Sequence, residues 1–264
     1  MKSLLVSSKK KIFTFTAFLI LLFFAFHSQN FRLDASSDTL ILQNDKNFKY
    51  FNYYNNIFPT KNFLVLAIKS EKIIDIDYIN QIKIIKNKLE KIEGIESIFS
   101  ITDAPILLLN DLKLTDLANK EIQTLDNSQI DLNKALNELS RSPIFHNQII
   151  NTDKTVSSMI IYLKKNDDFY KIKKQKEHYS KLNAQEDITN YNNLEKKYRE
   201  LKTINTKNRN NLIQDIRDTL INENISYEYF LGGIDMIVDD TLRFIKNDII
   251  VFSISVLIFI FIVL

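Results

Sequence analysis

The sequence predicts an α+β fold in three parts: a transmembrane helix, an outer domain with a ferredoxin-like split β-α-β sheet and helical insertions, and the start of a second transmembrane helix. Three observations lead to this prediction. Apolar runs lie near both ends of the chain, at 12–31 and 248–264. The region between them, 32–247, is polar and long enough for one domain with its own core. Within it, a strand–helix–strand order occurs twice.

The first apolar segment, 12–31, follows a short N-terminal stretch, 1–11, with four lysines: Lys2, Lys9, Lys10 and Lys11. Basic residues ahead of an apolar run keep that end of a membrane helix in the cytoplasm, so the residues after it should lie outside. A cleaved signal peptide has the same layout, but it needs small residues just before the cut. Residues 26–31, at the end of the apolar segment, lack such small residues. Residues 35–37 match a cleavage site better, but they lie too far beyond the apolar segment. We therefore interpret 12–31 as an uncleaved anchor.

The second apolar segment ends with the chain. From Ile249 to Leu264 nearly every residue is apolar, and no basic residue, Trp or Tyr follows. A helix needs roughly 20 such residues to cross the hydrocarbon core of a bilayer, and spanning helices usually carry anchors on both sides. We therefore expect the chain to be the opening portion of a longer membrane protein, cut inside its second transmembrane helix.

Charge and cysteine content exclude several classes of site. Lys and Arg total 35 and Asp and Glu total 32, which leaves a formal charge of +3 spread over both signs. Lys-rich stretches such as 171–176 are therefore interpreted as solvated helix faces, and no nucleic-acid partner is expected. The absence of cysteine rules out disulfides and thiolate metal sites, and it is compatible with a domain outside the cytoplasm.

The first β-α-β unit is predicted at 62–101. A short apolar run at 62–69 indicates a buried strand. A helical stripe covers 75–93, with Lys and Glu on the opposite face and apolar residues at three- and four-residue steps: Ile76, Ile79, Ile82, Ile85, Leu89 and Ile92. Gly94 should end this helix, and 95–101 alternates as a second strand.

A helical insertion and a second β-α-β unit follow. The insertion, 106–142, contains helical segments such as 131–139 and is closed by Pro143. The second unit, 155–233, begins with a third strand at 156–164, which a long polar helix pair at 169–222 follows. A fourth strand at 226–231 and a glycine pair at 232–233 complete the unit. Low apolar content before Leu212 indicates that the helix pair is exposed rather than part of the core. A final helix then leads toward the membrane.

No residues have the spacing of a catalytic, cofactor or metal site, so we predict that the chain is not an enzyme and uses no cofactor. The only glycines form no phosphate-binding loop: Gly94, Gly232 and Gly233. Serines are plentiful, but none lies in a nucleophile-elbow pattern. Substrate-binding residues are not predicted.

Three histidines and one pair of adjacent carboxylates are the candidate metal ligands in the sequence. His27, His146 and His178 are far apart and lack metal-ligand spacing, and His146 is interpreted as a surface residue in a loop. Asp239 and Asp240 should point in different directions on a helix, so we interpret them as solvated side chains or a helix cap. Charged residues inside the membrane would mark a transporter, and neither apolar stretch, 12–26 or 249–264, contains one.

Four stretches, in order, carry a family resemblance: 32–45, 92–105, 142–145 with 151–155, and 231–240 with 245–248. They resemble predicted exporters of the RND (resistance–nodulation–division) superfamily, in the branch that includes the MMPL-type lipid transporters. In the same order, the four stretches look like the opening of the family's outer loop, the end of its first β-α-β unit, the segment before its third strand and the start of its second transmembrane helix. Lys154 stands where relatives often have glycine, which weakens the third match.

The resemblance implies a proton-driven exporter with two similar halves, each carrying an outer porter domain, and apolar or amphipathic (lipid-like or drug-like) substrates. It implies a bacterial inner membrane location with 32–247 in the periplasm. The partners would be the lipid bilayer, the rest of the transporter chain and, in a homo-oligomer, further copies. The family's proton-relay acids lie in a later helix, which we expect beyond Leu264, so no catalytic residue transfers to this chain.

Two other classes of protein stay open. A sensory or chemoreceptor-like protein has the same helix–domain–helix layout, but it needs a cytoplasmic output domain and favours long bundled helices outside. A membrane-anchored periplasmic scaffold would use the polar helices at 107–140 and 169–222 to hold its partners.

Overall fold

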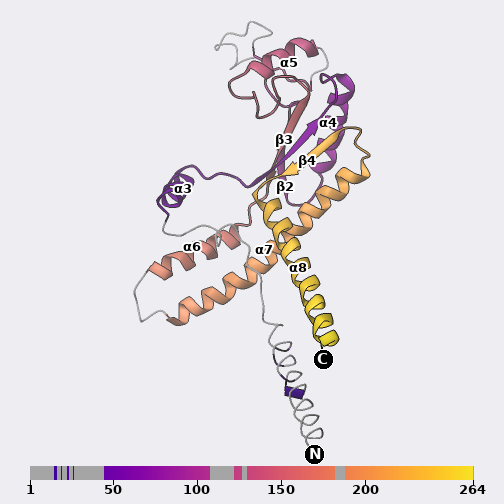
Figure 1. The fold of residues 1–264 in the computed structure, drawn as a ribbon. Coiled ribbons are helices and arrows are strands. Elements are labelled where there is room, and N and C mark those ends of the chain that lie inside the picture. The colour runs from indigo at the N-terminus through magenta and orange to yellow at the C-terminus, as the bar shows by residue number, and fades with distance from the viewer. Residues whose placement is uncertain are drawn as a thin grey trace, which may run out of the picture. The chain divides into compact units, whose positions relative to one another are not determined.

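The computed structural model describes residues 45–107, 122–126, 130–181 and 188–263, together with Phe15, Thr16, Leu19, Phe23 and Phe26. The chain divides into two compact units, Phe51–Ile237 and a second unit formed by Met1–Tyr50 with Val238–Leu264. The larger unit contains the whole sheet (Figure 1).

A four-stranded antiparallel sheet in the order β2-β3-β1-β4 forms the centre of the larger unit. Its strands are β1 (Phe63–Lys69), β2 (Ile95–Phe99), β3 (Val156–Leu163) and β4 (Glu228–Gly232). Helix α4 (Ile76–Leu89) connects β1 to β2, while α6 (Asp167–Lys181) and α7 (Ile188–Asn222) connect β3 to β4. The elements therefore follow a β-α-β-β-α-β order. The four strands predicted from the sequence are all present, within a few residues of their predicted bounds.

One face of the sheet packs against α4 and the C-terminal part of α7. From the strands, the buried residues include Leu64, Leu66, Ile68, Met159, Ile161 and Leu163. The helices contribute Ile79, Ile82, Ile85 and Leu89 from α4, and Leu212, Ile213, Ile216 and Leu220 from α7. Burying each such side chain stabilises the fold by about 1.5–3 kcal/mol relative to leaving it exposed, so this layer holds the domain together.

Helix α4 has the predicted apolar stripe but ends earlier than predicted. It begins after Asp75, whose carboxylate accepts a hydrogen bond from the Tyr78 backbone N–H at 2.9 Å, and it ends at Leu89 rather than near 93. Gly94 does not end the helix. It lies in the turn that leads into β2, with φ +99°, and a Cβ there would lie 3.2 Å from Leu212 Cδ2. The close approach of α7 and the left-handed backbone both favour glycine at this position.

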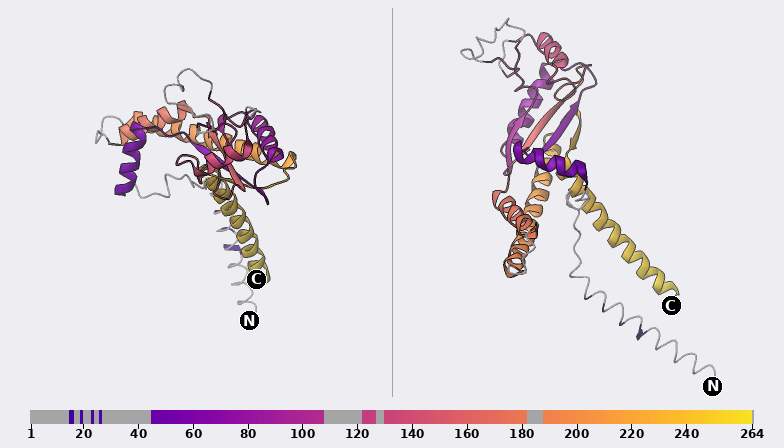
Figure 2. Two further views of the ribbon diagram at one scale, coloured as in Figure 1. Left: turned by 90° about the horizontal axis from the view of Figure 1, so that it is seen from above. Right: turned by 90° about the vertical axis from the view of Figure 1, so that its left-hand side faces the viewer.

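The described part of the insertion lies at the end of the sheet opposite to α6 (Figure 2). It contains α5 (Leu132–Arg141), whose N-cap residue Asp131 accepts a hydrogen bond from the Lys134 backbone N–H. Ile106 N–H donates to the Gln123 carbonyl at 2.9 Å, which joins the two sides of the insertion. Of the other residues predicted to be helical within 107–140, 122–126 form no helix, and 108–121 and 127–129 lie outside the described residues.

The polar helix pair predicted within 169–222 is present as α6 and α7, which run side by side away from the sheet (Figure 1). We call α6 and residues 188–211 of α7 the arm. Its contacts are mainly polar and aromatic: Lys176 pairs with Glu195 at 2.6 Å, and the rings of Phe169 and Tyr198 stack at 5.6 Å. The hydrogen bond from Lys176 holds the pKa of Glu195 below its usual range. Ile204 on the arm is 53% exposed, which confirms the prediction of an exposed helix pair.

The fold class predicted from the sequence, with a transmembrane helix at the start, is wrong. The structure is an α+β fold with a four-stranded antiparallel sheet, and none of the helices in the described residues combines the length and apolar character that a membrane crossing needs. Helix α8 (Ile234–Val263) is long, but charged residues extend along it to Asp248. The predicted helix at 12–31 lies almost entirely outside the described residues.

One helix was not predicted. Helix α3 (Lys46–Ile57) precedes β1, and the carboxylate of Asp45 caps it by accepting hydrogen bonds from the backbone N–H groups of Asn47 and Phe48 at 2.6 and 3.1 Å. The four asparagines of this segment are poor helix formers, which concealed the helix in the sequence.

Candidate functional site

The second face of the sheet is only partly covered. Side chains alternate along each strand, so the neighbours of the buried residues point to the opposite side. We call this side the open face and define it by six apolar or aromatic residues from β1, β3 and β4: Phe63, Val65, Ala67, Ile160, Tyr162 and Phe230. Phe63 and Phe230 are 47% and 56% exposed, and the other four are half-buried.

The register of the strands brings these residues together. Phe63 pairs with Tyr162, Val65 with Ile160, and Ala67 with Phe230. The rings of Phe63 and Tyr162 lie 6.4 Å apart in an edge-to-face arrangement, which fixes one end of the row. The open face is therefore a continuous apolar strip across three strands.

Charges border the strip at both ends, and they are paired. At one end Lys61 Nζ lies 2.6 Å from Glu96 Oε1 and 5.9 Å from the centre of the Tyr162 ring. At the other end Lys69 Nζ lies 3.0 Å from Glu228 Oε2. Exposed ion pairs of this kind add little stability. Because each of these two lysines is paired with a carboxylate, the borders of the strip suit an apolar or amphipathic ligand better than an ion.

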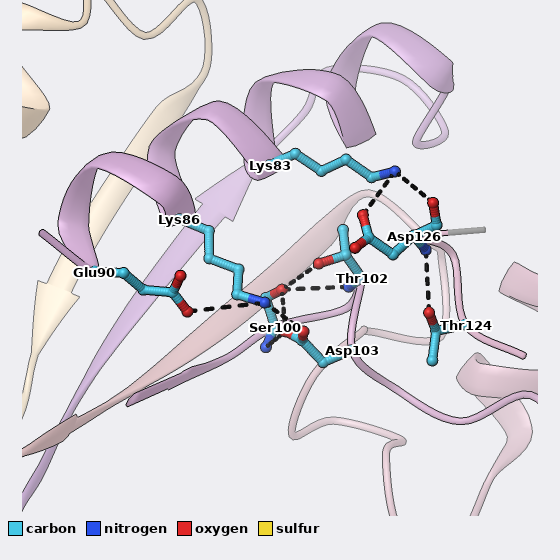
Figure 3. Close-up of polar contacts among 8 residues, drawn as sticks. All are labelled: Lys83, Lys86, Glu90, Ser100, Thr102, Asp103, Thr124 and Asp126. Carbon is cyan, nitrogen blue, oxygen red and sulfur yellow. Dashed lines mark hydrogen bonds and ion pairs between the residues drawn. The ribbon is translucent and has the colours of Figure 1, made fainter. Parts of the chain in front are cut away.

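The strongest cluster of polar side chains lies elsewhere, between α4 and the residues after β2 (Figure 3). The Asp103 carboxylate accepts hydrogen bonds from the Ser100 backbone N–H and hydroxyl at 2.9 and 2.8 Å, and it pairs with Lys86 of α4. Lys83 contacts Asp126 of the insertion at 2.9 Å. These contacts fasten the turn at 100–103 and the insertion to α4.

This cluster is not arranged for catalysis. Ser100 and Thr102 are 0% and 1% exposed, so no substrate can reach their hydroxyl groups. The Ser100 oxygen lies 2.7 Å from the Thr102 oxygen, and the Lys86 ammonium is paired with a carboxylate rather than positioned as a base. We therefore assign the cluster a structural role.

The histidines that were considered from the sequence form no site in the described residues. The Nδ1–H of His146 donates to the Ser140 carbonyl oxygen at 2.8 Å, while Nε2 accepts from the Asn147 amide at 2.9 Å. Both ring nitrogens thus bind the chain itself, and the ring is half-buried rather than fully on the surface. His27 and the side chain of His178 lie outside what the structure describes.

The interpretation of Asp239 as a solvated side chain or a helix cap is wrong. Asp239 lies inside α8, is 4% exposed, and accepts a hydrogen bond from Arg243 Nη2 at 2.9 Å. A buried carboxylate needs such a partner because an unpaired charge away from water is costly. In the described residues, no group of three or more His, Cys, Asp or Glu side chains could hold a metal ion.

The open face is not apparent from the sequence. The run at 62–69 is apolar at almost every position, which led us to interpret it as fully buried, whereas only alternate residues are. No family model matches the chain, and no curated protein matches it.

Proposed function

We propose that the domain at 32–247 is a porter-like domain in the N-terminal part of a proton-driven RND-type exporter of the bacterial inner membrane, and that it lies in the periplasm. The open face is the surface along which an apolar or amphipathic substrate passes. The observation that carries this proposal is a continuous apolar strip with paired charges at its ends, displayed on a rigid sheet. The family resemblance of four stretches along the chain adds support from the sequence.

The physical argument is one of desolvation. A lipid-like substrate that lies on the strip removes apolar surface from water on both sides, which is favourable by about 25 cal/mol per Å². The strip contains no buried charge that binding would leave unpaired, so little of this gain is lost. Binding remains shallow because the surface is open on one side, and a passage surface should release its substrate readily.

A charge on the open face should therefore impair transport. We expect Phe230→Glu to reduce proton-driven efflux of a lipophilic dye from cells that carry the protein by about tenfold, because a carboxylate replaces roughly 1.4 kcal/mol of apolar contact. Ile204→Glu on the arm is the matched control, since Ile204 and Phe230 are exposed to similar degrees, 53% and 56%. A protonophore should abolish the difference between the variants.

Other outcomes would favour other functions. Equal efflux from both variants and the parent protein would contradict a passage role for the open face. The polar, projecting arm is the feature that favours a scaffold instead. In that case Ile204→Glu, and not Phe230→Glu, should release partner proteins from membranes.

A further inference from the structure

Helix α3 presents an exposed aromatic face. Tyr50, Tyr53, Tyr54 and Ile57 follow the i, i+3, i+4, i+7 spacing of one helix face, which we call the tyrosine face. These four residues are 57%, 61%, 58% and 49% exposed. The rings of Tyr53 and Tyr54 contact each other edge to face at 5.7 Å. Phe51 is also 59% exposed and extends the apolar surface to one side.

Such a helix is poorly stabilised by its own residues. It has 12 residues, four of them asparagine, and isolated helices of this length are marginal in water even with better sequences. The Asp45 carboxylate accepts hydrogen bonds from only some of the backbone N–H groups in the first turn, those of Asn47 and Phe48. An amphipathic helix gains most of its stability by packing its apolar face against something, and the tyrosine face is available for that.

The chemistry of the face points to a lipid surface. Tyrosine combines an apolar ring with a hydroxyl group, a combination that suits the boundary between headgroups and acyl chains. Lys46 lies one turn before Tyr50 on the tyrosine face, Lys49 lies at its edge, and the helix contains no Asp or Glu. Lysines in this position can extend their charged ends toward phosphate groups while their methylene stems lie on apolar surface. The positive charge complements an anionic bilayer and gives no advantage at a neutral one.

We propose that the tyrosine face of α3 lies in the headgroup region of an anionic bilayer, with the helix parallel to the membrane plane. This contact fixes the start of β1 close to the membrane surface, because only 58–62 separate the helix from the strand. The inference does not rest on the proposed function, since a scaffold or a receptor could use the same contact.

The chain contains no tryptophan, so a single introduced tryptophan reports on one position alone. Tyr53→Trp places the reporter on the tyrosine face. Phe48→Trp, on the opposite face of the same helix, is the matched control. The full-length chain is mixed with phosphatidylcholine vesicles, with or without phosphatidylglycerol, and the emission wavelength and quenching by brominated lipid are recorded.

We expect the tryptophan at position 53 to shift to shorter wavelength and to be quenched by brominated lipid, more strongly with phosphatidylglycerol, while the tryptophan at position 48 changes little. Adding Lys46→Gln and Lys49→Gln should weaken this response by about fivefold for each lysine. Equal responses at both positions would overturn the proposal, as would no response at position 53. A concentration-dependent shift at position 53 without vesicles would also overturn it and identify a second copy as the occupant.

Discussion

Replacing Gly233 by alanine should destabilise the sheet by about 2–4 kcal/mol, because the substitution combines backbone strain with a clash in the core. Gly233 has φ +140°, which side chains with a Cβ rarely adopt. A Cβ there would lie 2.8 Å from Leu64 Cδ2 and 3.1 Å from the Phe63 carbonyl oxygen. Leu64 is fully buried in the core.

The neighbouring glycine provides the control. A Cβ on Gly232 would meet only the Val65 carbonyl oxygen, at 4.0 Å, so Gly232→Ala should change stability by less than about 1 kcal/mol. Hydrogen exchange of β1 and β4 amides in the full chain measures the local opening free energy of both variants. Similar losses in the two variants would show that the close contact at Gly233 is not what fixes the junction between β4 and α8.

Tyr78→Phe should destabilise the domain by about 1–3 kcal/mol near neutral pH, because it leaves buried polar atoms without a partner. Tyr78 is fully buried in the core. Its hydroxyl group donates to the Ile68 carbonyl at 2.8 Å and lies 2.8 Å from Ser157 Oγ. The hydroxyl thus joins α4 to β1 and β3.

Tyr78 should also make the stability of the domain fall at alkaline pH. Burial raises the pKa of Tyr78 from 10.0 to about 12, so the folded protein holds its phenolic proton over a range in which the unfolded chain releases it. The stability linked to this proton is present below pH 10 and is lost as pH rises toward 12, by roughly 2–3 kcal/mol in total.

The Tyr78→Phe variant lacks this titration. The stability difference between parent and variant, measured by hydrogen exchange or urea unfolding, should therefore shrink as pH rises from 10 toward 12. Tyr227, whose ring lies 4.8 Å from Tyr78 and whose pKa burial also raises, is present in both proteins. A difference that stays constant with pH would contradict a protonated, buried Tyr78.

Some parts of the fold could be predicted because their signals are local. The stripe from Ile79 to Leu89 has the period of a helix, and Asp75 precedes it as a cap, so α4 was predictable almost to its last turn. The strands were recognised as short apolar or alternating runs bounded by turn residues.

Other features depend on contacts that a single sequence does not reveal. The open face was missed because an apolar run reads the same whether one or both sides of a strand are buried. Asp239 was interpreted as a solvated side chain or a helix cap because nothing local shows that its position on α8 is buried and paired with Arg243. The membrane helices predicted at 12–31 and 248–264 followed from apolar runs in the sequence, whereas no helix in the described part of the chain combines the length and apolar character of a span.

The most direct test of the proposed function identifies what touches the open face. A benzophenone-bearing phenylalanine analogue in place of Phe230 is activated by light in membranes of cells that carry the protein, with the same analogue in place of Ile204 as the control. We predict adducts with lipid-like small molecules at position 230 and few at position 204. Equal labelling at the two positions, or adducts at position 230 with protein alone, would contradict the account of the open face as a substrate surface.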